Sequence, residues 1–223
     1  IERSATAYLG LWGNDSNSVT TLKTNNWYHV VFCYNNLNYQ QRIFINGVLD
    51  SSTTGAKSNL TGTGTNIGRV PFAFGYFKGK IASALFYNRN LSPQEIRSLF
   101  LSTAQKYIKK SEPFVTDGLI FHLDASNPTS YSGSGSTVWA DLSSSYAHGK
   151  LYSGPSFTSE NGGGIVFDGT DDYFTTDTAT AFNGLTRMSA EITFKLTGTI
   201  SGYEHIINKP QSVNGGTWAL YSG

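Results

Sequence analysis

One stretch of the sequence decides the fold: residues 66–100, which read NIGRVPFAFGYFKGKIASALFYNRNLSPQEIRSLF. Within it, residues 80–87 are predicted to form a strand whose side chains alternate between two faces. This alternation places Ile81 and Tyr87 on one face and Phe86 on the other. Both faces are largely apolar, which is typical of a strand inside a sandwich rather than at its edge. The stretch therefore predicts a central, fully buried strand.

The residues that follow this strand predict one short helix near residues 92–103. Ser92 is a favourable N-cap residue, and Glu95 stands three positions later, as in a capping box. Leu91 before the cap and Ile96 within the first turns have the spacing of a hydrophobic staple. We expect the apolar side of this helix to pack against the sheet.

The composition points to a β-rich chain with many turns. The 223 residues include 24 glycines, 14% aromatic residues and 14% charged residues, and the net charge is +1. This charge gives no electrostatic attraction to nucleic acid, and no apolar run approaches the ~20 residues of a membrane span. Cys33 is the single cysteine, which excludes a disulfide within the chain, and its alternating context predicts a buried position.

Strand patterns separated by turn signals recur along the chain. Asn46-Gly47 stands between two of them and is a strong signal for a type I′ hairpin turn. The predicted strands cover residues 5–13, 18–22, 27–34, 40–45, 48–51, 118–123, 188–196, 204–208 and 217–221. Short strands at near-regular spacing predict an all-β sandwich.

The order of motifs in the first half resembles the closing segment of laminin-G-like domains in the concanavalin A-like lectin and glucanase superfamily. The matching residues are Phe77, Gly79, Ile81, Tyr87, Asn88, Arg89, Leu91, Ser92, Glu95 and Ile96. The resemblance implies a concanavalin A-like jelly-roll sandwich with one short helix. It also implies a binding module, without naming a ligand.

The second half resembles the opening segment of the same family. The matching residues are Gly118, Leu119, Leu123, Asp124, Trp139, Asp141, Leu142, Ser143, Phe167, Asp168, Gly169, Asp171, Asp172 and Tyr173. The halves thus stand in reversed order, with a closing half at residues 1–110 and an opening half at residues 111–223. Two interpretations stay open: a window on a tandem array, or one circularly permuted domain.

Glycosidase chemistry is not expected, although the superfamily includes glucanases. Retaining enzymes need two carboxylates about 5–5.5 Å apart, which alternating acids on one strand would supply. Glu191 has Ser189 and Thr193 as its neighbours on the same strand face, so it lacks a partner there. His29 is predicted to be a packed, hydrogen-bonded residue, and no catalytic residues are assigned.

An acidic turn is the candidate metal site. Asp168, Asp171 and Asp172 would offer hard oxygen ligands of the kind that Ca²⁺ prefers. The alternative is structural, with Asp171 capping the turn through backbone N–H groups. Many relatives carry an acidic residue just after the isoleucine of the "G-x-I" strand, where this chain has Ala82.

Glycan binding would use exposed aromatic rings beside loops as stacking surfaces. The candidates are Trp12, Tyr39, Tyr76 and Tyr203. The competing interpretation places such rings in the core, as expected for other tryptophans of the chain.

The motifs are also similar to domains in structural proteins of marine tailed bacteriophages. This similarity implies a non-catalytic structural or adhesion module of a virion or cell-surface fibre, located on a virion surface or outside the cell. Its partners would be glycans or other copies of the same protein, in an oligomeric or tandem assembly, without nucleic acid or membrane insertion. The alternative is a carbohydrate-binding domain of a secreted bacterial adhesin or enzyme.

Overall fold

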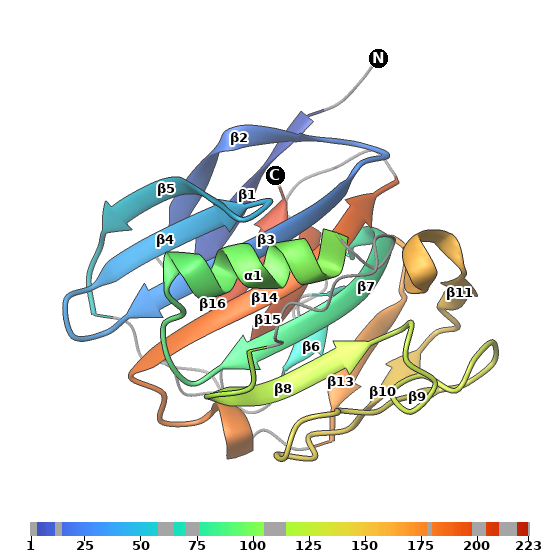
Figure 1. The fold of residues 1–223 in the computed structure, drawn as a ribbon. Helices are drawn as coiled ribbons and strands as arrows, with labels where there is room; N and C mark the ends of the chain where they lie inside the picture. Colours follow the sequence, from blue (N-terminus) through green and yellow to red (C-terminus); the bar gives the residue numbers. More distant parts are fainter. Residues whose placement is uncertain are drawn as a thin grey trace.

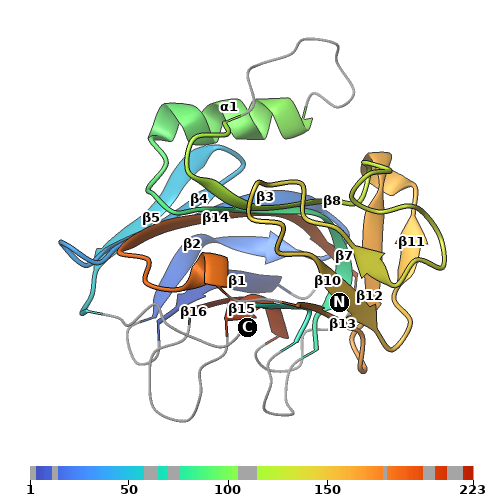
Figure 2. The same cartoon turned by 90° about the horizontal axis from the view of Figure 1, so that it is seen from below.

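The protein forms two packed antiparallel sheets with one α-helix on the outside of one of them (Figures 1 and 2). The computed structural model describes residues 4–11, 15–57, 65–69, 76–104, 115–177, 180–197, 204–209 and 218–222. The strands are β1 (Ser4–Gly10), β2 (Ser16–Lys23), β3 (Trp27–Asn35), β4 (Gln40–Ile45), β5 (Val48–Thr54), β6 (Asn66–Ile67), β7 (Lys78–Tyr87), β8 (Leu119–Asp124), β9 (Val138–Trp139), β10 (Gly149–Tyr152), β11 (Ser156–Thr158), β12 (Gly164–Asp168), β13 (Tyr173–Thr176), β14 (Arg187–Leu196), β15 (Glu204–Lys209) and β16 (Trp218–Ser222). The prediction of an all-β sandwich with one short helix is confirmed.

Strands from the two halves of the sequence are interleaved in both sheets. Sheet A has the order β2-β1-β16-β15-β6-β13-β10-β9, and sheet B has the order β11-β12-β7-β14-β3-β4-β5, with β8 also paired to β7. In sheet B, β14 lies between β7 and β3 and is antiparallel to both. In sheet A, β16 pairs with β1, and β6 lies between β15 and β13. The two halves therefore share one sandwich, and the boundary predicted near residue 110 lies outside the described residues.

The main core fills the space between the two sheets. It is rich in aromatic side chains, many of them in edge-on contact, such as Phe86 with Phe182 and Trp139 with Phe174. Ala84 and Ile192 pack in the same layer from neighbouring strands. Burial of this apolar surface is the main favourable contribution to the stability of the sandwich.

A second, smaller core lies between sheet B and the helix α1 (Pro93–Ala104). Ile96 and Leu99 of the helix are buried there beside Cys33 of β3. The helix begins with the expected capping box: the Glu95 N–H donates to Ser92 Oγ (3.2 Å), and the Ser92 N–H donates to Glu95 Oε2 (2.8 Å). Figure 2 shows α1 on the side of sheet B away from sheet A. In the described part of the chain, no helix has the length and apolar character needed to cross a membrane.

The central strand β7 departs from simple alternation at one residue. The pairing with β14 passes from Ser83–Thr193 to Ile81–Phe194, so β7 carries one extra residue at Ala82. Ile81 therefore lies in the core between the sheets, whereas Tyr87 lies in the core beneath α1. The prediction that Ile81 and Tyr87 share a face was wrong, because a bulge reverses the side-chain direction beyond it.

Candidate binding site at the β10–β13 edge

Two neighbouring strands of sheet A carry outward-facing polar and aromatic side chains. On β10, Leu151 is buried, while Lys150 and Tyr152 are exposed. On β13, Phe174 is buried, while Tyr173 is half-buried on the outer face. This alternation follows from the two-residue period of a strand with one face on the core.

The two outward tyrosines form a stacked pair. Tyr152 and Tyr173 are directly opposite each other in the β10–β13 pairing. Their ring centroids are 4.8 Å apart and the ring planes differ by 8°. Tyr152 keeps 39% of its surface exposed, so the stack presents an aromatic surface to solvent.

Arg69, just after β6, completes this arrangement. Its guanidinium carbon lies 3.5 Å from the centroid of the Tyr173 ring, a close cation–π contact. The ring of Tyr152 at 4.8 Å leaves no room for a guanidinium on the same face of Tyr173. Tyr173 is therefore held between Tyr152 and Arg69, and we refer to these three side chains as the tyrosine ladder.

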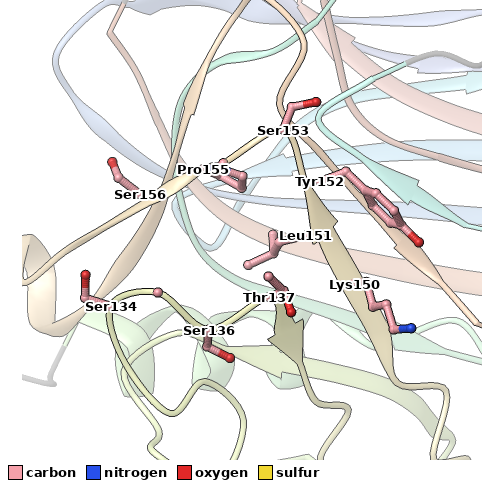
Figure 3. Close-up of a pocket in the computed structure, with 11 residues that line it drawn as sticks. Ser134, Ser136, Thr137, Lys150, Leu151, Tyr152, Ser153, Pro155 and Ser156 are labelled. Carbon is pink, nitrogen blue, oxygen red and sulfur yellow. The ribbon is translucent and has the colours of Figure 1, made fainter.

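A surface cavity of about 600 Å³ has one residue of the ladder, Tyr152, in its lining (Figure 3). It lies between the segment before β9 and the turn from β10 to β11, and Lys150 and Tyr152 of β10 are among its lining residues. Most of the other lining residues are small and carry hydroxyl groups: Ser134, Ser136, Thr137, Ser153 and Ser156. Figure 3 shows Tyr152 and Lys150 on one side of β10 and Leu151 on the other. Its volume is within the range of small-ligand sites, and its hydroxyl groups can both donate and accept hydrogen bonds.

The predicted acidic turn leads directly into the ladder. Asp168, Asp171 and Asp172 lie between β12 and β13, and each offers a carboxylate oxygen within 4.8 Å of the others. The structure thus brings together the three acids that the sequence singled out. The turn ends at Tyr173, so the acids directly precede one residue of the ladder in the sequence.

The carboxylates of this turn already accept hydrogen bonds from its own backbone. Asp168 Oδ1 accepts from Thr170 N (2.7 Å) and Asp171 N (3.4 Å), and Asp172 Oδ2 accepts from Asp168 N (3.0 Å). Burial raises the pKa of Asp172, and the charges of Asp168 and Asp171 raise it further. The oxygens suit Ca²⁺ in kind, but two of the three carboxylates help to hold the turn. The calcium site remains a prediction.

Two of the four predicted aromatic candidates, Tyr39 and Tyr76, lie within the described residues. Trp12 and Tyr203 lie outside the described residues. Tyr39 is exposed in the turn between β3 and β4 of sheet B, with φ of 58°. Tyr76 is half-buried and forms a bridge with His205 of β15 in sheet A. Tyr39 and Tyr76 thus belong to different sheets, and neither belongs to the ladder.

Sequence reasoning missed the residues of the ladder, although part of the signal was present. The segments GKLY (149–152) and YFTT (173–176) alternate, so Tyr152 and Tyr173 could have been placed on a solvent-facing side. The contact of Arg69 with Tyr173 spans more than 100 positions and follows from strand pairing alone.

Beneath α1 lies a buried acid–histidine pair that the sequence did not link. His29 Nε2 is 3.1 Å from Glu191 Oε1, and both side chains are 2% exposed. The ring of His29 also meets the edge of Phe100 of α1, with centroids 5.6 Å apart. Burial raises the pKa of the neighbouring Tyr87 hydroxyl, and the charge of Glu191 raises it further. The expectation that His29 is packed is confirmed, but neither of its ring nitrogens makes a hydrogen bond of normal geometry. Glu191 is sealed from solvent.

Comparison with known proteins agrees with this architecture. Residues 3–97 match the model of a laminin-G-like family described as the concanavalin A-like lectin/glucanases superfamily. No curated protein matches the chain. The matched segment runs from the start of β1 into α1, and the fold is a concanavalin A-like β-sandwich. At this general level, the match supports a carbohydrate- or protein-binding module.

Proposed function

We propose that this protein is a non-catalytic module that binds glycans on the tyrosine ladder and in the adjoining cavity. The observation that carries the proposal is the stacked, partly exposed Tyr152–Tyr173 pair, with parallel ring planes, beside a cavity lined with hydroxyl groups. A flat aromatic surface can pack against the apolar face of a sugar ring, and the hydroxyl groups can bond to its polar edge. Such a mixture of apolar surface and a few polar groups is typical of small-ligand sites.

The absence of catalysis is also part of the proposal. Glu191, the acid on the central strand β14, is paired with His29 beneath α1 and is inaccessible to a substrate. Asp168 and Asp172 hold backbone N–H groups of their own turn. Acid–base chemistry on a glycosidic bond needs two accessible carboxyl groups in separate roles, which these contacts disfavour.

The biological setting follows from the sequence resemblance. We propose a structural or adhesion module of a virion or cell-surface fibre, outside the cell, with glycans or further copies of the protein as partners. The second candidate is a carbohydrate-binding domain of a secreted bacterial adhesin or enzyme. The match to a lectin and glucanase superfamily is compatible with both settings.

A glycan array with three proteins tests the binding proposal. We expect the natural protein to bind a subset of glycans and Tyr152→Ala to lose most of that signal. Tyr146→Ala is the matched control, because Tyr146 is 71% exposed but contacts His148 rather than the ladder. Equal binding by Tyr152→Ala, or no binding by the natural protein, would reject the proposed site. Release of reducing sugar from the bound glycans would reject the non-catalytic assignment.

A further inference from the structure

We infer that Arg69 is the positioning residue of the tyrosine ladder: it fixes the plane of Tyr173 and, through it, that of Tyr152. The inference deepens the proposed function and rests on it only where it concerns glycan affinity. The guanidinium lies 3.5 Å from the centroid of Tyr173, whose other face is stacked on Tyr152 at 4.8 Å. A ring held on both faces loses the freedom to rotate out of the stack.

Arg69 can do this because the residue before it is hydrogen-bonded to two neighbouring segments. Gly68, its predecessor, donates its N–H to Ile206 O (2.8 Å), and its carbonyl accepts from Phe77 N (2.8 Å). The φ of Gly68 is +85°, and an added Cβ would lie 2.8 Å from the Phe167 ring. Only glycine suits this position, since both the backbone conformation and the space exclude a side chain.

Two buried asparagines provide a further anchor beneath Arg69. Asn66 of β6 and Asn208 of β15 face each other across the strand pair and are 4% and 2% exposed. Asn66 Nδ2 donates to Asn208 Oδ1 (3.4 Å), and Asn208 Nδ2 donates to the carbonyl of Arg69. A buried amide that lacks this partner would carry a desolvation cost, so the pair favours one position of the Arg69 backbone.

This arrangement gives the ladder a supporting layer from other strands. The tyrosines come from β10 and β13, whereas their support comes from β6 and β15 on the far side of β13. A ligand that packs on Tyr152 then meets a ring that is already in place. Affinity gained in this way comes from a smaller entropic cost of ordering the Tyr152 ring on binding, rather than from a new contact.

The first experiment needs no glycan. Nitration of tyrosines by tetranitromethane, mapped by mass spectrometry, reports the accessibility of each ring, and near-ultraviolet circular dichroism reports the order of the pair. We expect Arg69→Met to increase the nitration of Tyr173 severalfold relative to Tyr146, and to weaken the dichroism. Arg69→Lys retains the cation, so its Tyr173 nitration and its dichroism should both lie between those of the natural protein and those of Arg69→Met. The matched control is Arg42→Met, because Arg42 lies 5.6 Å from the ring of Phe44 in sheet B, away from the ladder.

The second experiment measures binding of the neutral glycan that gives the strongest array signal with the natural protein. We expect Arg69→Met to weaken that binding about three- to tenfold, as loss of a cation–π contact predicts, with Arg69→Lys in between. Unchanged nitration and dichroism in Arg69→Met, at an unchanged melting temperature, would overturn the positioning role. If Arg69→Met unfolds, Asn208→Ala must give the same rise in Tyr173 nitration, and its failure to do so would overturn the role. If Arg69→Met changes the nitration of Tyr173 and the dichroism, but the natural protein binds no glycan, the positioning role is upheld and the proposed function is rejected.

Discussion

At the scale of single residues, several buried polar side chains fix the conformation of loops between strands through hydrogen bonds. Asp141 is the clearest of them, at 3% exposure. Its carboxylate accepts hydrogen bonds from His122 N (2.8 Å), Ser143 N (2.9 Å), Ser143 Oγ (2.8 Å) and Ala147 N (2.9 Å). These bonds explain physically why the W-x-D-L-S segment carries an aspartate, because one side chain accepts from four donors.

Asp141→Ala should therefore lower the free energy of unfolding by about 3 kcal/mol or more, since it leaves buried N–H groups without an acceptor. Asp141→Asn keeps one acceptor oxygen and should cost less. Urea unfolding measures both effects. Asp177→Ala serves as the control, because Asp177 is exposed and should change stability by no more than about 0.5 kcal/mol. Equal stability of Asp141→Ala and the control would contradict this account of the loop.

Two glycines in the strands make room for aromatic rings. A Cβ on Gly79 would lie 2.5 Å from the ring of Phe77 and 2.3 Å from the carbonyl oxygen of Lys195. The F-x-G-x-I motif thus pairs a ring with the glycine two residues later. Gly149 likewise leaves room for a ring, that of Phe174, which lies on the neighbouring strand β13 rather than two residues away.

We expect Gly79→Ala to destabilise the protein by about 3 kcal/mol, because the added methyl group meets backbone that cannot move aside. Thermal unfolding is a suitable measurement. Gly164→Ala is the matched control in the adjacent strand β12, where an added Cβ has contacts no closer than 3.4 Å. If both variants melted at the same temperature, the steric explanation of the motif would be wrong.

At the scale of elements, the start of α1 is stabilised by ion pairing as well as by its capping box. Arg89 Nη2 is 2.7 Å from Glu95 Oε1, and Arg89 Nε is 2.8 Å from Asp117 Oδ2. The bond to Arg89 is the main reason that the pKa of Glu95 falls from 4.5 to about 2, with further help from Ser92. The N-R-x-L-S segment therefore links the turn, the helix and the chain that leads into β8.

This shift has a definite pH dependence. A carboxyl group with a lowered pKa in the folded state stabilises the fold above its unfolded pKa and loses that contribution as the pH falls. For Glu95 the loss should occur between about pH 4.5 and pH 2. Glu95→Gln should lower stability at neutral pH by about 0.5–1 kcal/mol and flatten the acid limb of the stability curve.

Guanidinium unfolding at a series of pH values tests this expectation. Glu160 should remain as a second acid-sensitive group in the variant, because its bonds to Lys195 and Lys80 lower its pKa to about 2. If stability fell as steeply at acid pH in Glu95→Gln as in the natural protein, the Glu95–Arg89 pair would not control the acid part of the stability curve.

At the scale of the whole molecule, the interleaving of strands from both halves is the dominant feature. β14 pairs with β3 over nine residues and with β7 on its other side, so the first half contains two central strands that meet only through the second half. Ser189 of β14 also accepts a hydrogen bond from Leu91 N beside the helix. A half alone would expose both apolar faces of its central strands.

The sandwich should therefore unfold in one cooperative transition. Hydrogen exchange followed by mass spectrometry should give the same midpoint in denaturant for peptides from β3 and β14. Two separate transitions, one for each half, would contradict the shared sandwich.

Within this picture, the permuted single domain and the tandem array stay as alternative proposals. A molecular mass in solution that equals that of the monomer at all protein concentrations would favour the permuted single domain. A mass that increases with protein concentration would favour the tandem array.

The sequence by itself determined the elements whose signals are local. The buried strand β7, the N-terminus of α1 and the Asn46-Gly47 turn, with φ of 51° and 76°, all depend on neighbours within a few residues. Side-chain period, capping and turn conformation are short-range effects, so they can be identified without a fold. The acidic turn of Asp168 to Asp172 was identified for the same reason.

Only the tertiary structure decided which distant residues meet. The bulge at Ala82, the His29–Glu191 pair and the contact of Arg69 with Tyr173 all depend on strand register. Register is set jointly by the packing of two sheets, and a shift of one residue would turn each of these side chains to the opposite face. The tyrosine ladder thus follows from the alignment of β6, β13 and β10, which no local pattern specifies.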